Sequence, residues 1–250
     1  ENNDGGVQMK YNVEGNVMQT LKIELDPGES IYSETGALQY MTPEIALQTN
    51  FTGGIGGVLK RAITGNSLTL NHFTAQGNRG IVSFTTRMPG HIVPIQTDHY
   101  GSVLVQRHSF LCAEETVQLG IAGNFGLSGF FGGNGLIYNR LSGNGMAFIS
   151  VDGEVTEKEL NPGETLLIHP GHLAAYEQKV KFEVQRLKGF KNMFLGGDGI
   201  FLAKVTGPGK IWMHSLSIHN LAEVLSPYMQ EASVSRKTGN VGSFINNLFD

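Results

Sequence analysis

The sequence of 250 residues predicts a mainly β domain built from three related units. Most of the chain consists of short segments in which apolar and polar residues alternate, such as LKIEL at 21–25 and VKFEV at 180–184. Such alternation is typical of half-buried strands. Two further patterns each occur three times: a pair of glycines separated by seven residues, and a Pro-Gly dipeptide ahead of an apolar segment.

The paired glycines enclose the segments VLKRAIT, LIYNRLS and IFLAKVT, at 57–65, 135–143 and 199–207. In each copy the first, second and sixth enclosed positions are apolar and the seventh carries a hydroxyl group. A phosphate-binding glycine loop leads into a helix, and a P-loop also contains Lys followed by Ser or Thr. Here a strand pattern follows the first glycine instead, so we expect these glycines to serve tight turns where strands meet.

The three Pro-Gly dipeptides of this pattern lie at 27–28, 89–90 and 162–163, each ahead of an apolar segment. Pro presets φ at the second position of a type II turn, and Gly supplies the positive φ of the third. We therefore expect three units, at about 1–88, 89–161 and 162–217, within a single domain that covers 1–229.

Convincing helical periodicity occurs only in IHNLAEVLSPYM at 218–229. Asn220 is placed to cap this helix, Leu221, Val224 and Leu225 share one face, and Pro227 ends the pattern. Residues 230–250 are polar apart from a late apolar patch, and we expect a tail that is ordered only if this patch docks.

Composition excludes several function classes. The formal net charge of -4 and the absence of a basic block argue against a nucleic-acid partner. The single cysteine, Cys112, excludes an intrachain disulfide and a cysteine-based zinc site, and it follows an apolar run, as a small core residue does. We expect a cytoplasmic protein, or a mitochondrial one if a presequence before Glu1 has been removed.

Several segments in order carry a family resemblance: SFLCAEETV, FGGNGLIYNRLSGNG, LNPGETLLIHPGHLAAY and LGGDGIFLAKVTGPGKIWMHS. From about residue 27 to 227 the chain resembles the mitochondrial-biogenesis ("altered inheritance of mitochondria") proteins and their bacterial relatives. The resemblance implies a double-stranded β-helix-like fold similar to the tryptophan RNA-binding attenuation protein superfamily, with links to membrane or respiratory-chain organisation. We call each segment enclosed by paired glycines, together with the residues just before it, a glycine phrase. Many family members have Gly-Glu-Gly at the start of this phrase. In place of the Glu, this chain has Gly56, Asn134 and Asp198 in the three copies. The family supplies no established catalytic residues.

The best candidate for a metal site is formed by His169, His172 and Glu177, because β-helix proteins of the cupin type bind metal through His-x-His and a following Glu. Histidines three residues apart point to opposite faces of a strand unless the chain turns between them. Pro170-Gly171 provides residues for such a turn. The equivalent place in the first unit, 34–37, keeps the turn without the histidines, which indicates a structural turn, and we expect no bound metal or other cofactor.

No other motif points to catalysis. The remaining histidines have no partner at ligand spacing: His72, His91, His99, His108, His214 and His219. A GxSxG elbow is absent, so we assign no catalytic residues and do not expect an enzyme. Two alternatives stay open: a metal-dependent or other small-molecule enzyme of the β-helix type, and an RNA-binding module suggested by the superfamily alone.

The remaining class is a non-catalytic oligomeric binding or scaffold protein. Repeated antiparallel units leave sheet edges that must be shielded or paired, and charged residues, the usual shields, are only 16% of the chain. We therefore expect a homo-oligomer. Phe125, Phe130 and Phe131 lie in an uncharged glycine-rich run, where they form either a contact for a protein or membrane surface or part of the core beneath a loop.

Overall fold

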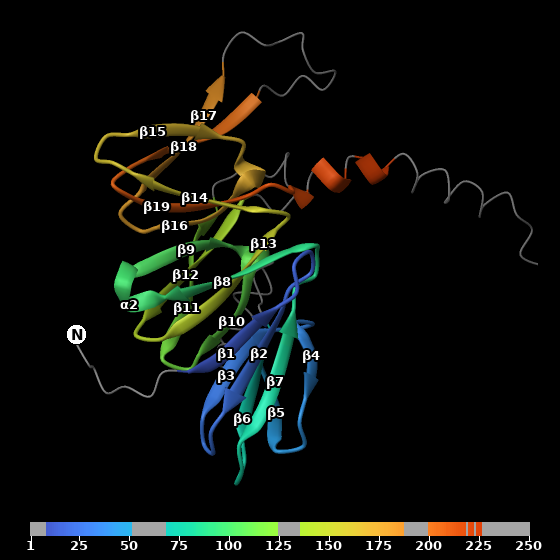
Figure 1. Cartoon of the computed structure of the whole chain (residues 1–250). Coiled ribbons are helices and arrows are strands. Elements are labelled where there is room, and N and C mark those ends of the chain that lie inside the picture. The colour runs from blue at the N-terminus through green and yellow to red at the C-terminus, as the bar shows by residue number, and fades with distance from the viewer. Residues whose placement is uncertain are drawn as a thin grey trace, which may run out of the picture.

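The computed structural model describes residues 9–51, 69–124, 136–187, 200–218, 220–222 and 224–226. These residues form a mainly β protein whose strands lie in antiparallel sheets (Figure 1), as the alternating segments predict. Strand β1 (Lys10–Glu14) precedes a pattern of six strands that occurs three times.

Each repeat contributes six strands in the same order. The first repeat contains β2 (Thr20–Leu25), β3 (Ser30–Glu34), β4 (Leu38–Met41), β5 (Ile45–Phe51), β6 (Thr69–Ala75) and β7 (Gly80–Thr85). The second contains β8 (Gly90–Gln96), β9 (Ser102–Gln106), β10 (Phe110–Glu114), β11 (Val117–Asn124), β12 (Ile137–Gly143) and β13 (Met146–Asp152). The third contains β14 (Val155–Leu160), β15 (Thr165–Ile168), β16 (Leu173–Glu177), β17 (Lys181–Leu187), β18 (Ile200–Thr206) and β19 (Gly209–His214).

Strand pairing is the same in all three repeats. The sixth strand lies between the first and the third, as in β2-β7-β4, and the fifth lies between the second and the fourth, as in β5-β6-β3. The third strand of every repeat also carries a register shift at the same place, between Leu38 and Tyr40 in β4 and between Leu173 and Ala175 in β16. The three repeats of the described residues thus share one local fold.

Neighbouring repeats are joined by one antiparallel strand pair at each junction. Strand β3 pairs with β10, and β9 pairs with β16, which produces two six-stranded sheets that each combine two repeats. The ends of the molecule are a four-stranded sheet, β1-β2-β7-β4, and a three-stranded sheet, β15-β18-β17. Figure 1 shows the first repeat, in blue to cyan, at the opposite end of the molecule from the third repeat, in yellow to orange.

The core is continuous across the repeats, because each of its clusters contains buried side chains from at least two of them. Phe73 and Phe84 of the first repeat share a cluster with Phe148 of the second, whereas Trp212 of the third packs with second-repeat residues. Cys112 is fully buried in the first of these clusters, which confirms that it is a core residue.

Two of the three Pro-Gly dipeptides at 27–28, 89–90 and 162–163 form the expected turn. Gly28 and Gly163 have φ of +87° and +80° and lie just before β3 and β15. The prediction was wrong for the dipeptide at 89–90, because Gly90 begins β8 and packs against the backbone of Val151, where a side chain would not fit. The second repeat makes the equivalent connection through the short helix α2 (Thr97–Tyr100).

Strands β12 and β18 follow the first glycine of the second and third glycine phrases, as predicted, whereas the first phrase lies outside the described residues. The glycines that close these two phrases are needed for close packing. A Cβ at Gly143 would overlap the carbonyl oxygen of Thr116, and one at Gly207 would overlap the carbonyl oxygen of Asn161.

The described residues at 218, 220–222 and 224–226 are helical, in agreement with the predicted C-terminal helix. No described helix has both the length and the apolar character needed to cross a membrane.

Candidate functional site

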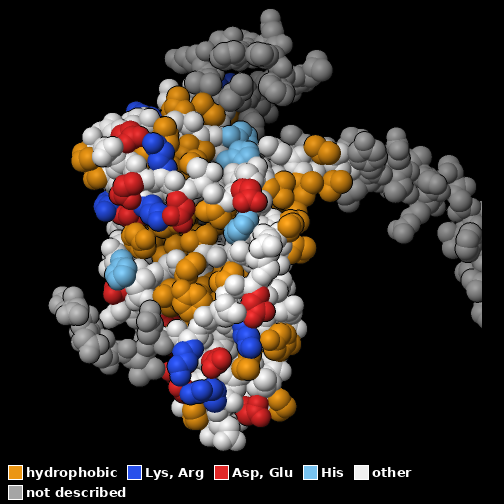
Figure 2. Space-filling model, viewed as in Figure 1, with side chains coloured by type: hydrophobic (Ala, Val, Ile, Leu, Met, Phe, Trp, Pro, Cys, Tyr) orange, Lys and Arg blue, Asp and Glu red, His pale blue; other side chains and the backbone are white. Residues whose placement is uncertain are grey.

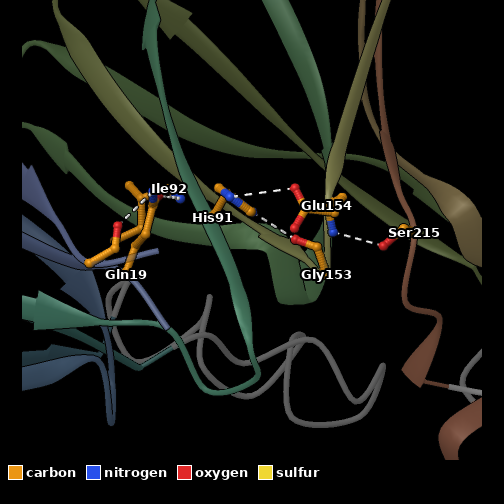
Figure 3. Close-up of polar contacts among 7 residues, drawn as sticks. Gln19, His91, Ile92, Gly153, Glu154 and Ser215 are labelled. Atoms are coloured by element: carbon orange, nitrogen blue, oxygen red, sulfur yellow. Dashed lines mark hydrogen bonds and ion pairs between the residues drawn. The ribbon is translucent and has the colours of Figure 1, made fainter. Parts of the chain in front are cut away.

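Polar side chains gather where successive repeats begin. Gln19, His91 and Glu154 occupy equivalent places, at the start of the first strand of each repeat, and Figure 3 shows them in one row. The backbone N–H of Ile92 donates to Gln19 Oε1 at 2.7 Å. His91 Nε2 lies 3.7 Å from Glu154 Oε2. The repeats are thus connected by side chains at equivalent positions.

His91 is oriented by the backbone. Its Nδ1 lies 2.8 Å from the carbonyl oxygen of Gly153, and a carbonyl only accepts, so Nδ1 carries the hydrogen and Nε2 faces Glu154 (Figure 3). The Glu154 side chain is 82% exposed, so its 3.7 Å contact with His91, an ion pair only when the ring is protonated, is a weak surface interaction. The backbone N–H of Glu154 donates to Ser215 Oγ at 2.7 Å, which attaches the end of the third repeat to the same row.

A second polar cluster surrounds His214 at the end of β19. The backbone N–H of Asp152 donates to His214 Nδ1 at 2.9 Å, so Nδ1 is an acceptor and the ring hydrogen lies on Nε2. That Nε2 lies 3.1 Å from Gln106 Oε1 and 3.3 Å from Ser109 Oγ. Burial and, to a lesser extent, the neighbouring His172 together lower the pKa of His214 to about 4. His214 is therefore a neutral hydrogen-bonding group.

Ser109, His214 and Asp152 have the residue types of a serine-hydrolase triad but not its arrangement. A general base needs a free Nε2 lone pair toward the serine and an Nδ1–H that donates to the carboxylate. In this protein Nε2 carries the hydrogen, and Nδ1 contacts the Asp152 backbone rather than its carboxylate. The geometry supports a structural bond between repeats rather than activation of Ser109.

The turn between His169 and His172 forms as the sequence predicts. Residues Pro170–His172 make a 3-10 turn, and the backbone N–H of His172 donates to the His169 carbonyl at 2.9 Å. The turn places the two rings 5.5 Å apart, at an interplanar angle of 66°. His172 Nδ1 donates to the His214 carbonyl at 2.8 Å, so this histidine also joins the cluster around His214.

Glu177 does not join the two histidines. Its Oε1 accepts from the backbone N–H of Lys210 at 3.1 Å, and its Oε2 lies 2.7 Å from Lys179 Nζ. Lys210 lies four residues before His214 on β19, which corresponds to about 13 Å along a strand. Among the described residues no group of three His, Cys, Asp or Glu side chains is arranged to hold a metal ion.

The sequence profile of the family described as Mitochondrial biogenesis AIM24 matches residues 11–216, most of the chain. The chain belongs to this family. It is 23% identical over 235 residues to an uncharacterized protein of Streptococcus pyogenes serotype M6, and the match covers 90% of this chain and 93% of that protein. These findings confirm the resemblance drawn from the glycine and Pro-Gly segments, bacterial relatives included.

A crystal structure of another Streptococcus pyogenes protein has the same fold as this AIM24 family member. The TM-score is 0.72 at 21% sequence identity, and the match covers 88% of this chain and all of the bacterial chain. The three-repeat architecture with its polar junctions therefore lies on a fold that a distant relative shares.

Sequence reasoning missed Asp152, His214 and Gln106 as a group, because 62 residues separate the first two and only strand pairing brings them together. Burial raises the pKa of Asp152 to about 6, the one signal of an unusual environment at this position. In sequence, the only hint is an acidic residue at the end of a wholly buried strand, MAFISVD. The predicted partner contacts Phe125, Phe130 and Phe131 lie outside the described residues.

Proposed function

We propose that this AIM24 family protein is a non-catalytic, oligomeric scaffold that presents a binding surface. One observation carries the proposal: the polar groups at the candidate site bond to the backbone of a neighbouring repeat. His91 bonds to Gly153, and His214 accepts from the Asp152 N–H. Side chains held in this way connect repeats and are not free to transfer protons to a substrate.

The groups that a metal-dependent enzyme would use are similarly engaged. His172 donates to a backbone carbonyl, and Glu177 bonds to Lys179 and Lys210. These contacts favour a scaffold over the enzyme alternative, which needs several ligands that converge on one point.

The distribution of charge favours a protein or a membrane surface over nucleic acid as a partner. Lys and Arg side chains on the face in Figure 2 are interspersed with Asp and Glu. Arg79 lies 2.5 Å from Asp26, and Lys158 lies 2.9 Å from Glu164. A nucleic-acid groove needs unpaired cations along one continuous path.

Three repeats of antiparallel strands also support assignment of the fold to the class of the tryptophan RNA-binding attenuation protein. This assignment concerns the fold alone and does not include RNA binding. The family description, mitochondrial biogenesis, favours an organising role over a metabolic one. A cytoplasmic or mitochondrial location belongs to this proposal.

Light scattering of the purified chain tests the scaffold proposal. We expect a mass that is a multiple of 27.1 kDa at micromolar concentration. A mass of one chain at every concentration tested would overturn the proposal.

A further inference from the structure

The terminal sheets each have an edge strand with no neighbour among the described residues. In the first repeat β4 pairs only with β7, and in the third repeat β15 pairs only with β18. Unpaired edges expose backbone N–H and C=O groups that can pair with another chain.

These two edges are the two halves of a junction that the protein already uses twice. Strand β4 is the third strand of its repeat, like β10 and β16, and β15 is the second, like β3 and β9. At both internal junctions a second strand pairs antiparallel with the third strand of the following repeat, β3 with β10 and β9 with β16. Strand β15 therefore lacks a third strand, and β4 lacks a second strand.

The internal junctions also define a register. Tyr32 lies opposite Ala113 at the first junction, and Leu104 lies opposite Tyr176 at the second. These positions correspond to Leu167 in β15 and to Met41 in β4, because equivalent strands align without gaps. In the same way, the pairs Ser33–Cys112 and Val105–Ala175 correspond to Ile168 opposite Tyr40.

Exposure differs sharply between the internal and the terminal positions. At the internal junctions, both residues of the pair Tyr32–Ala113 and both residues of the pair Leu104–Tyr176 are buried. In contrast, Leu167 is 49% exposed, Met41 is 37% exposed and Tyr40 is 47% exposed. Large apolar side chains are thus exposed at three of the four positions that would form a third junction, whereas the fourth, Ile168, is already buried.

We propose that β15 of one copy pairs antiparallel with β4 of a second copy, with Leu167 opposite Met41. The proposal rests on the proposed oligomeric scaffold and identifies its partner as a second copy of the chain. One chain cannot make this contact with itself, because β4 and β15 lie at opposite ends of the molecule (Figure 1). The contact is strand addition, in which backbone hydrogen bonds supply affinity and alternate side chains supply specificity.

The interface is head-to-tail, because each copy contributes a different strand to each of its two contacts. Such an interface leaves one edge of each kind open after every addition, so assembly continues until a ring closes or a filament forms. A two-fold dimer would instead use the same strand from both copies.

Two glutamate variants test the strand pairing. Met41→Glu and Leu167→Glu each place an unpaired charge in every head-to-tail contact, so we expect each variant alone to have the mass of one chain. In an equimolar mixture, the intact Leu167 edge of one variant meets the intact Met41 edge of the other, while the remaining edges carry opposed glutamates. We expect a dimer that contains one copy of each variant and does not grow further.

The matched control is Leu47→Glu, on β5, where the leucine is 42% exposed and belongs to neither edge. This variant should assemble like the unmodified chain. If the Met41→Glu and Leu167→Glu chains remain assembled, or if their mixture stays monomeric, the strand pairing is overturned while the scaffold proposal stands. If the unmodified chain is itself monomeric, both proposals fail.

Cysteine variants test the register without adding charge. Mixing Met41→Cys with Leu167→Cys under oxidised glutathione should give a covalent dimer, since directly opposite Cβ atoms lie about 5 Å apart. Either variant alone should give none, and Leu47→Cys mixed with Leu167→Cys should also give none. A mixture of Met41→Cys and Leu167→Cys that forms no covalent dimer would overturn the register.

Discussion

His214 accepts a hydrogen bond from the backbone N–H of Asp152, and the pKa shifts of the two side chains make the stability of the fold depend on pH in opposite directions. The bond is 2.9 Å long and joins the end of β13 in the second repeat to the end of β19 in the third. Burial lowers the pKa of His214 to about 4 and raises the pKa of Asp152 to about 6. Both groups therefore favour their neutral forms, and each makes stability depend on pH in its own direction.

Replacement of His214 should change the response to acid. The unfolded His has a pKa of about 6.5, so the unfolded chain takes up this proton first, and stability is lost as pH falls from 6.5 toward 4. The variant His214→Asn keeps an acceptor for the Asp152 N–H but does not titrate. The stability advantage of the natural chain over this variant should shrink by about 2 kcal/mol between pH 7 and pH 5, as measured by urea unfolding. An advantage that is constant with pH would contradict the lowered pKa.

Asp152→Asn should stabilise the protein at neutral pH. The folded carboxyl group has the higher pKa, so the unfolded chain ionises first and stability is lost as pH rises from about 3.8 to 6; the amide removes this penalty. We expect a gain of about 1 to 3 kcal/mol at pH 7, which should vanish below about pH 4, where the carboxyl group is protonated in both states. The exposed Glu154, changed to Gln, is the matched control and should show little effect in the same thermal unfolding series. Destabilisation by Asp152→Asn at pH 7 would show that the carboxylate has a favourable partner.

Gly143→Ala should be much more harmful than Gly28→Ala. Both glycines have positive φ, +115° and +87°, which by itself disfavours alanine by about 1 kcal/mol. At Gly28 the added Cβ meets nothing within 4 Å, whereas at Gly143 it overlaps the carbonyl oxygen of Thr116. We expect a loss of about 3 kcal/mol for Gly143→Ala and about 1 kcal/mol for Gly28→Ala in urea unfolding. Equal losses would mean that the backbone near Thr116 moves aside easily.

Cys112 should not react with thiol reagents while the protein is folded. The side chain is fully buried, and burial raises the pKa of its thiol well above the ordinary value. Because the thiolate is the reactive form, an aromatic disulfide reagent should label the chain only at the rate of unfolding, with full labelling in denaturant. Rapid labelling in native buffer would show that the core around Phe148 opens locally, and it would also require replacement of Cys112 before the cysteine-pairing experiment.

Local sequence patterns predict the strands better than they predict the pairing between strands. The alternation at 21–25 lies within β2, and the turn between His169 and His172 forms as expected, because both depend on neighbours in the sequence. The dipeptide at 89–90 was misassigned because a glycine required for close packing against Val151 has the same sequence as a glycine required for a turn.

The candidate site was less accessible to prediction than the strands were. The metal hypothesis grouped His169, His172 and Glu177 by their spacing along the chain, but the register of β16 with β19 holds Glu177 beside Lys210. Contacts such as that of Asp152 with His214 depend on which strands pair across repeats, and no local pattern specifies that choice.

The sheets that combine two repeats also have a consequence for protein synthesis. The edge of β3 that faces the second repeat has no partner until residues 110–114 leave the ribosome, and the equivalent edge of β9 must wait for 173–177. During that interval an unfinished sheet is exposed to other nascent chains, a known cause of aggregation. During synthesis, β3 of a newly made first repeat can therefore pair with the β10 strand of another chain before β10 of its own chain has been made.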